Sequence, residues 1–220
     1  MKKLIETKDL RKVFGDKSVL GFFLAPALMK LMKLDKINKL YDKVADFEGR
    51  ECLEAFLAEM RITYETPSSD LANLPKEGPF ITVSNHAYGA LDGIILMHLV
   101  SEDRPDLKVI VNYLLSRIRP LQNFFLPVNA FDKNVSSRSS ITGIRLAKES
   151  LQKGNPLGLF PAGEVSHIGP SGLVEDIPWH TAIVKFIMNA GVPVVPIYFE
   201  GHNSARFLRR AKIHPMLQTA

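Results

Sequence analysis

The amino-acid sequence predicts an α/β fold, with a mixed, largely parallel sheet flanked by helices and an N-terminal pair of helices in front of it. Two observations predict this fold. After residue 78, short apolar runs alternate with helical patterns, and several runs are apolar on both faces, as strands buried in a parallel sheet are. The 220-residue chain is 46% hydrophobic and 23% charged, which suits a compact core. Binding sites are then expected in loops at the strand ends.

The first part of the chain, from Leu20 to Ala58, has a helical pattern. Its apolar residues recur at steps of three and four, which predicts two helices. Lys30, Lys33, Lys36 and Lys39 are interleaved with the apolar positions. A basic amphipathic helix of this kind suits anionic lipid headgroups, but the same pattern is typical of a core-packing helix with a solvated lysine edge. The pattern leaves both interpretations open.

A stretch with proline and glycine, Asp70 to Gly78, predicts a linker. It divides the chain into an N-terminal amphipathic helical element, residues 1–70, and an α/β domain, residues 71–220. Five strands are expected in this domain, at Phe80 to Ser84, Leu107 to Asn112, Phe124 to Val128, Leu157 to Phe160 and Val192 to Phe199. Helices are expected between them at Leu91 to Leu99, Ser139 to Gln152 and Trp179 to Met188.

Composition excludes several classes of protein. Cys52 is the single cysteine, so no intramolecular disulfide forms and a reducing compartment is expected. No apolar run reaches 18 residues, and residues 1–10 alternate charged with apolar side chains, which disfavours a membrane span and a signal peptide. The 28 Lys and Arg against 23 Asp and Glu give a net charge of +5, but no basic run is interleaved with aromatic residues. A nucleic-acid partner is therefore not expected.

One short segment carries residues suited to catalysis. After the strand that ends at Ser84, the chain reads Asn85, His86, and then, six positions after the histidine, Asp92 at the start of an apolar helix. Gly89 frees the turn between them, so the carboxylate can approach the imidazole and fix its tautomer. The other ring nitrogen would then act as a general base, which contributes roughly 100- to 10,000-fold in rate. The alternative is a loop histidine beside a helix-capping aspartate.

Three further blocks follow in order. They are Ala130-Phe131-Asp132-Lys133, Phe160-Pro161-Ala162-Gly163-Glu164-Val165-Ser166, and Val192-Pro193-Val194-Val195-Pro196-Ile197. With the His-Asp segment, these blocks resemble the glycerolipid acyltransferases, the PlsC-type 1-acylglycerol-3-phosphate acyltransferase superfamily. The resemblance covers residues 79 to 201. It implies acyl transfer in which His86 deprotonates an acceptor hydroxyl, Asp92 supports the histidine, and unassigned backbone amides stabilise the oxyanion.

The sequence departs from the family pattern in two ways. Five residues separate the histidine from the aspartate, where the family usually has four. Lys133 stands where the family usually has arginine, and the third block lacks both its first glutamate and its arginine. Because arginine is the bidentate ligand for phosphate, recognition of a phosphate-bearing acceptor is in doubt. The pattern is most similar to the divergent, haemolysin-related branch, which is associated with O-acylation of amino-acid-containing lipids.

The same resemblance implies substrate-binding residues in the second and third blocks. Lys133 is expected to bind an anionic group, with Arg138 and Arg145 nearby on one helical face, although a solvated basic face is the alternative. Gly163 allows close approach of the backbone, and Glu164 is expected to meet the acceptor or brace the histidine loop. The alternative here is an ordinary strand-to-helix turn with a first-turn carboxylate.

Two polar residues that flank these positions complete the expected substrate-binding set. Ser166 ends the third block, and Asn85, next to the histidine, is also expected to brace the turn. An apolar groove for the acyl chain is expected to be lined by Leu114, Leu115, Phe124, Phe125 and Leu126, although these residues suit a core equally well.

Other chemistries are disfavoured. His167 and His180 invite a metal site with the histidine and aspartate of the first block, but no two histidines have a recognised ligand spacing, so no metal is expected. A serine hydrolase is disfavoured because the sequence has no Gly-x-Ser-x-Gly elbow.

The resemblance implies a peripheral enzyme on the cytoplasmic face of a membrane. It needs no cofactor, and its partners are the membrane surface, a lysolipid acceptor, and acyl carrier protein or acyl-CoA as donor. The acceptor is either an amino-acid-containing lysolipid or 1-acylglycerol-3-phosphate. A non-catalytic lipid-binding module of the same fold and a thioesterase are the competing functions. Since the family usually continues beyond the fourth block, a chain truncated at its C-terminus is expected.

Overall fold

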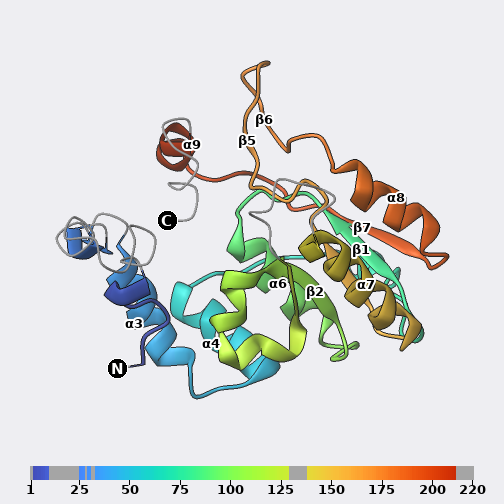
Figure 1. The fold of residues 1–220 in the computed structure, drawn as a ribbon, viewed down its shortest axis with the longest axis horizontal. Coiled ribbons are helices and arrows are strands. Elements are labelled where there is room, and N and C mark those ends of the chain that lie inside the picture. Colours follow the sequence, from blue (N-terminus) through green and yellow to red (C-terminus); the bar gives the residue numbers. More distant parts are fainter. Residues whose placement is uncertain (1, 10–24, 28, 31–32, 129–137, 212–220) are drawn as a thin grey trace.

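A computed structural model describes residues 2–9, 25–27, 29–30, 33–128 and 138–211 (Figure 1). Its helices are α3 (Leu34–Val44), α4 (Gly49–Met60), α5 (Ser68–Leu71), α6 (Ala90–Val100), α7 (Arg138–Gln152), α8 (Thr181–Asn189) and α9 (Ala205–Ala211). Two 3-10 helices, η1 (Tyr113–Arg117) and η2 (Arg119–Phe124), follow the second strand. The strands are β1 (Ile81–Ser84), β2 (Lys108–Asn112), β3 (Phe125–Val128), β4 (Leu157–Leu159), β5 (His167–Ile168), β6 (Val174–Glu175) and β7 (Val194–Ile197).

The main sheet has the strand order β3-β2-β4-β1-β7, and each neighbouring pair is parallel. It contains all five strands that the sequence predicts, and the α/β prediction is confirmed. Among the described residues, antiparallel pairing is confined to a separate hairpin of β5 and β6, which projects away from the sheet (Figure 1).

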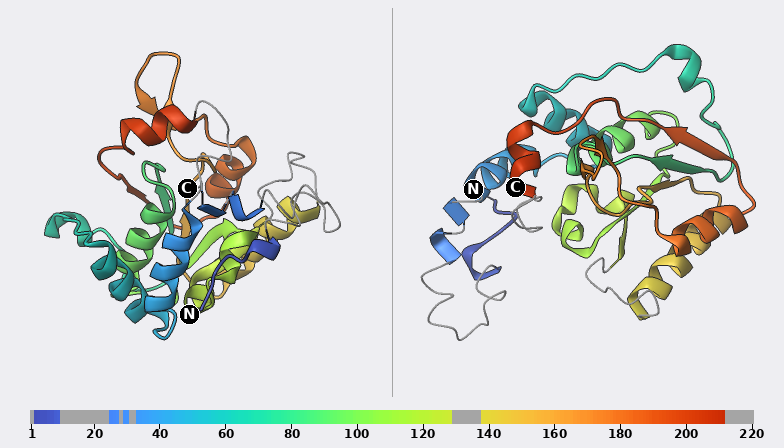
Figure 2. Two further views of the ribbon diagram at one scale, coloured as in Figure 1. Left: turned by 90° about the vertical axis from the view of Figure 1, so that its left-hand side faces the viewer. Right: turned by 90° about the horizontal axis from the view of Figure 1, so that it is seen from above.

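Helices cover both faces of the sheet because the strands are apolar on both faces. On one face Phe80 and Val109 share a core with Leu53 of α4 and with Leu96 and Val100 of α6. The other face carries a second core of buried residues from β1, β4 and α7: Ile81, Val83, Ala147, Leu151, Leu157 and Leu159. Half-buried residues of α8 cover this core. Two views show α7 and α8 side by side (Figures 1 and 2).

The connections that leave two neighbouring strands, β1 and β4, run over opposite faces of the sheet. The chain leaves β1 through α6, on one face, and runs to β2. It leaves β4, the neighbour of β1, toward α8 on the opposite face and returns as β7. In open parallel sheets, ligands bind outside the carboxyl ends of strands where connections diverge in this way. The loops after β1 and β4 are therefore the expected site.

The N-terminal helices include one that belongs to the core of the sheet. Cys52, Leu53 and Leu57 of α4 are buried in the same cluster as α6, and α3 packs against α4. On α3, Lys36 and Lys39 are exposed. The division at residue 70 stays a prediction. Within the described residues, no helix combines the length and the apolar composition needed to cross a bilayer.

The segment expected to be a linker, Asp70 to Gly78, is joined to the domain by hydrogen bonds. It begins within α5, and Arg104 then holds its end by donating to the carbonyl oxygens of Pro75 and Gly78. Arg104 also forms a two-pronged ion pair with Asp106 and donates to the carbonyl of Gly154. The linker, like the division at residue 70, stays a prediction.

Candidate active site

His86 lies at the carboxyl end of β1, and its Nδ1 is 3.0 Å from Oδ2 of Asp92, in the first turn of α6. The Asp92 side chain is 0% exposed, whereas that of His86 is 18% exposed. The imidazole is therefore partly accessible to a ligand, while its carboxylate partner is shielded from water. This is the pairing that the sequence predicts.

The turn between the two residues is built around glycine. Gly89 has φ of 76° and ψ of −128°, a conformation that residues with a Cβ rarely adopt. A Cβ on Gly89 would also lie 3.1 Å from Cγ2 of Val165 in the third block. This turn accommodates the additional residue between His86 and Asp92, which are separated by five residues where the family usually has four.

Asp92 caps the helix as well as contacting the histidine. Its Oδ2 accepts the main-chain N–H groups of Tyr88 at 2.8 Å and Gly89 at 3.0 Å, in addition to facing the His86 ring. The helix-capping alternative from the sequence is thus also true, and the two roles coexist. A carboxylate with these donors at a helix N-terminus stays oriented and favours the Nδ1-protonated tautomer.

Asn85 joins β1 to the chain after β7. Its Nδ2 donates to the carbonyl of Phe199 at 2.9 Å, and its Oδ1 accepts the N–H of Phe199 at 2.7 Å. The His86 ring lies against Phe160, with centroids 4.4 Å apart, and Phe160 stacks on Phe199 at 6.4 Å. Asn85 thus ties the residue before the histidine to Phe199, whose ring ends the aromatic row, and its bracing role stays a prediction.

Ser166 and Asp176 secure the main chain of His86. The N–H of Ser166 donates to the carbonyl of His86 at 2.8 Å, and the Ser166 hydroxyl donates to Asp176. Asp176 also accepts the N–H of His86 at 3.2 Å. Sequence reasoning missed Asp176, which follows β6 and lies 90 positions from the histidine. No spacing signal links the two, because the β5–β6 hairpin brings them together.

Gly163 and Glu164, also of the third block, have different surroundings. Gly163 has φ of 72°, and a Cβ there would lie 3.5 Å from the His180 ring, which precedes α8. Glu164 is exposed and makes no hydrogen bond or ion pair with the described part of the chain. The alternative of a strand-to-helix turn is wrong, because the block leads into β5 and not into a helix.

Among the predicted basic residues, Arg145 has a described side chain. Lys133 lies outside the described residues, as does the rest of the second block. Arg138 begins α7, but its side chain is not described. Arg145 forms an exposed ion pair with Glu149, one helical turn away, at 2.7 Å. For Arg145 this geometry matches the solvated-face alternative.

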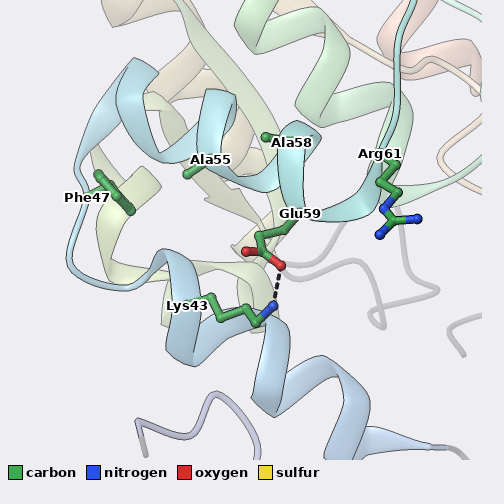
Figure 3. Close-up of a pocket in the computed structure, with 6 residues that line it drawn as sticks. All are labelled: Lys43, Phe47, Ala55, Ala58, Glu59 and Arg61. Carbon is green, nitrogen blue, oxygen red and sulfur yellow. Dashed lines mark hydrogen bonds and ion pairs between the residues drawn. The ribbon is translucent and has the colours of Figure 1, made fainter.

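The residues expected to line an acyl groove have mixed environments. Phe124 and Phe125 are 4% and 8% exposed and belong to the core, so for them the core alternative holds. Leu115 and Leu126 are half-buried, and the Leu114 side chain is not described. A pocket of about 540 Å³ lies elsewhere, between α3 and α4 (Figure 3); it is lined by Lys43, Phe47, Ala55, Ala58, Glu59 and Arg61.

Metal ligands do not gather at the site. Across the part of the chain that the structure describes, no three His, Cys, Asp or Glu side chains are grouped so that they could hold a metal ion.

Comparison with known proteins agrees with this geometry. Residues 15–219 match the model of a family described as acyltransferase, and the chain belongs to this family of enzymes. It is 29% identical over 192 residues to a lyso-glycine lipid O-acyltransferase of Bacteroides thetaiotaomicron, covering 87% of this chain and 68% of that protein. It is 26% identical over 214 residues to a protein of the same name from Phocaeicola vulgatus, covering 97% and 72% of the two chains. The predicted resemblance to acyltransferases of amino-acid lipids is confirmed.

Proposed function

We propose that this acyltransferase moves a fatty acyl group from a thioester to the hydroxyl of a lysolipid, with His86 as general base and Asp92 as its orienting partner. The observation that carries the proposal is the 3.0 Å contact between the partly exposed imidazole and the buried carboxylate, at the carboxyl end of β1. Membership of the acyltransferase family supplies the reaction class.

The proposed step balances without a cofactor or metal. Asp92 accepts a hydrogen bond from the Nδ1–H group of His86, so Nε2 has a free lone pair. Nε2 takes the proton of the acceptor's hydroxyl group while the hydroxyl oxygen attacks the thioester carbonyl carbon. The tetrahedral intermediate then collapses, the carbon–sulfur bond breaks, and the imidazolium returns its proton to the leaving thiolate. The ester product and the free thiol of acyl carrier protein or coenzyme A are released. Asp92 stabilises the transient imidazolium by its charge.

The acceptor we propose is an amino-acid-containing lysolipid. The named relatives act on lyso-glycine lipid, and the block Phe160 to Ser166 lacks the arginine that would clamp a phosphate. Such an acceptor carries one carboxylate in place of a phosphate. A single cationic side chain can form an ion pair with this carboxylate. Lys133 and Arg138 are the proposed contacts for that charge, and Gly163 and Glu164 for the rest of the acceptor.

We further propose that the enzyme works as a peripheral protein on the cytoplasmic face of a membrane. Lys30, Lys33, Lys36 and Lys39 are exposed on the N-terminal helical region, where they can meet anionic headgroups. The lysolipid acceptor resides in that surface, and the donor thioester arrives from solution.

A direct assay tests the proposal. The purified protein is incubated with radiolabelled acyl-acyl carrier protein or acyl-CoA and with either lyso-glycine lipid or lysophosphatidate in mixed micelles. We expect the ester of lyso-glycine lipid to form faster than phosphatidate. Release of free fatty acid without either ester would identify a thioesterase and contradict the proposal. Preference for lysophosphatidate would contradict the proposed acceptor but agree with the proposed acyl transfer.

A further inference from the structure

Asp92 has a second carboxylate oxygen whose environment is unusual. Oδ2 meets three donors, but Oδ1 is buried and has no hydrogen-bond partner in the described part of the chain. Two hydroxyls on β1, of Thr82 and Ser84, are likewise buried and unpartnered there. Buried polar atoms without partners destabilise the folded protein, and charged groups do so most.

The packing of α6 on the sheet shows which hydroxyl lies opposite the carboxylate. A Cβ built on Gly158 would lie 2.9 Å from Cδ2 of Leu96 and 3.5 Å from Oγ1 of Thr82. Leu96 and Thr82 therefore meet at one point on this face of the sheet. Because α6 follows β1 and runs back across the sheet, moving toward the start of the helix corresponds to moving toward the end of the strand.

The distance from Leu96 to Asp92 along α6 matches the distance from Thr82 to Ser84 along β1. Four residues along a helix advance ~6 Å and lead from Leu96 to Asp92. Two residues along a strand advance ~6.6 Å, keep the side chain on the same face, and lead from Thr82 to Ser84. Ser84 thus lies under Asp92, as Thr82 lies under Leu96. Ile81 and Val83, of opposite parity, face the other core.

We infer that Ser84 is a positioning residue for the proposed dyad: after rotation about χ1, its hydroxyl donates to the unpartnered Oδ1 of Asp92 and holds the carboxylate from the strand side. Rotation of the serine side chain about χ1, among its three staggered positions, moves the hydroxyl oxygen toward the carboxylate without movement of the main chain. Every oxygen of Asp92 then has a donor. The inference rests on the proposed function, in which His86 and Asp92 act together.

The consequence is electrostatic. Without the Ser84 hydroxyl, one oxygen of the buried carboxylate lacks a donor, which disfavours its ionised form and leaves more of its negative charge to the imidazole. Both effects favour protonation of the His86–Asp92 pair. The acid limb of the pH–activity profile should therefore move to higher pH. Tyr88 and Asp176, which share hydrogen bonds with Asp92 and His86, are retained in every variant.

The test compares Ser84→Ala with two matched variants. Thr82→Val removes the other buried, unpartnered hydroxyl from the same face of the same strand, and Ser84→Thr keeps the hydroxyl. We expect Ser84→Ala to lower kcat/KM at neutral pH by roughly tenfold, mostly through kcat, and to shift the acid limb upward. Thr82→Val and Ser84→Thr should keep the wild-type limb. Far-UV circular dichroism confirms folding of each variant.

A second measurement needs no substrate. The ring resonances of His86, assigned by their loss in His86→Ala, are followed by NMR as the pH is lowered, and Ser84→Ala should protonate at higher pH than the wild type. An unchanged titration in Ser84→Ala, or an equal change in Thr82→Val, would overturn the inference and leave the dyad intact. Failure of the proposed function is distinguishable, because it appears as retained acyl transfer in His86→Ala.

Discussion

At the scale of single residues, the site depends on side chains that serve two purposes. Asp92 begins α6 and holds His86, while Asn85 pairs with the main chain of Phe199 as a neighbouring strand would. Each side chain is fixed by backbone groups of a different element. The position of the imidazole is therefore tied to the stability of the turn in which it lies.

Asn85 offers a test of this coupling. Asn85→Ala removes two hydrogen bonds of 2.9 and 2.7 Å to Phe199 and leaves two main-chain groups unpaired, so the free energy of unfolding should fall by about 1–3 kcal/mol. Urea denaturation measures the change. Leu173→Ala, an exposed position on the β5–β6 hairpin, is the control and should stay within about 0.5 kcal/mol of the wild type. Equal stability of the two variants would contradict the bracing role.

The sequence predicted part of the site. His86, Asp92 and Asn85 were found because they are close in the chain and flank one strand end. Asp176 was not, since a loop of unrelated pattern brings it to the histidine. Glu164 illustrates the converse: its block was recognised, yet its side chain is exposed, and sequence similarity says nothing about where a side chain points.

At the scale of elements, the predicted strands and the three long helices of the domain were confirmed because each has a clear apolar run. The hairpin of β5 and β6 was missed, since two-residue strands are too short to show alternation. Strand order could not be predicted either. It depends on which face each connecting helix crosses, and that follows from long-range packing of α6, α7 and α8.

The contact between α4 and α6 predicts how stability depends on pH. His98 of α6 lies 2.6 Å from the Tyr64 hydroxyl, and Arg50 and Glu54 of α4 are nearby. Burial, and then the charge of Arg50, lower the pKa of His98 from its ordinary value of 6.5. The unfolded chain therefore takes up this proton at higher pH than the folded one. The stabilising contribution is complete above pH 6.5 and is lost as the pH falls through the folded-state pKa.

Denaturation of the wild type and of His98→Gln between pH 7.5 and 5 measures this effect. The wild type should lose stability more steeply on acidification than His98→Gln, which has no titrating ring at this position. Parallel curves for the two proteins would contradict the assignment to His98. His202→Gln, at an exposed position, is the matched control and should follow the wild type.

At the scale of the whole molecule, the N-terminal helices connect the core to the proposed membrane surface. α4 shares its core with the sheet, whereas lysines of α3 and of the segment before it are exposed. Core packing and lipid contact, which the sequence left as alternatives, are thus compatible in one helical region. The arrangement gives the enzyme a fixed orientation if the lysines meet the bilayer.

Liposome co-sedimentation tests this orientation. Each lysine near an anionic surface contributes about 1 kcal/mol, so Lys30→Gln with Lys33→Gln should weaken binding to vesicles containing phosphatidylglycerol by roughly tenfold or more. Raising the salt concentration should reduce the difference. The pair Lys148→Gln and Lys153→Gln, exposed at the end of α7, is the charge-matched control. If both double variants bind alike, the N-terminal helices do not direct the contact.

The central claim is that His86 is the base for acyl transfer, and the most direct measurement is the initial rate of ester formation by His86→Ala and Asp92→Asn. With acyl thioester and lyso-glycine lipid saturating, the account predicts a loss of about 100- to 10,000-fold for His86→Ala and at least about tenfold for Asp92→Asn, with wild-type circular dichroism. An ester-forming rate in His86→Ala within a few-fold of the wild type would contradict the account.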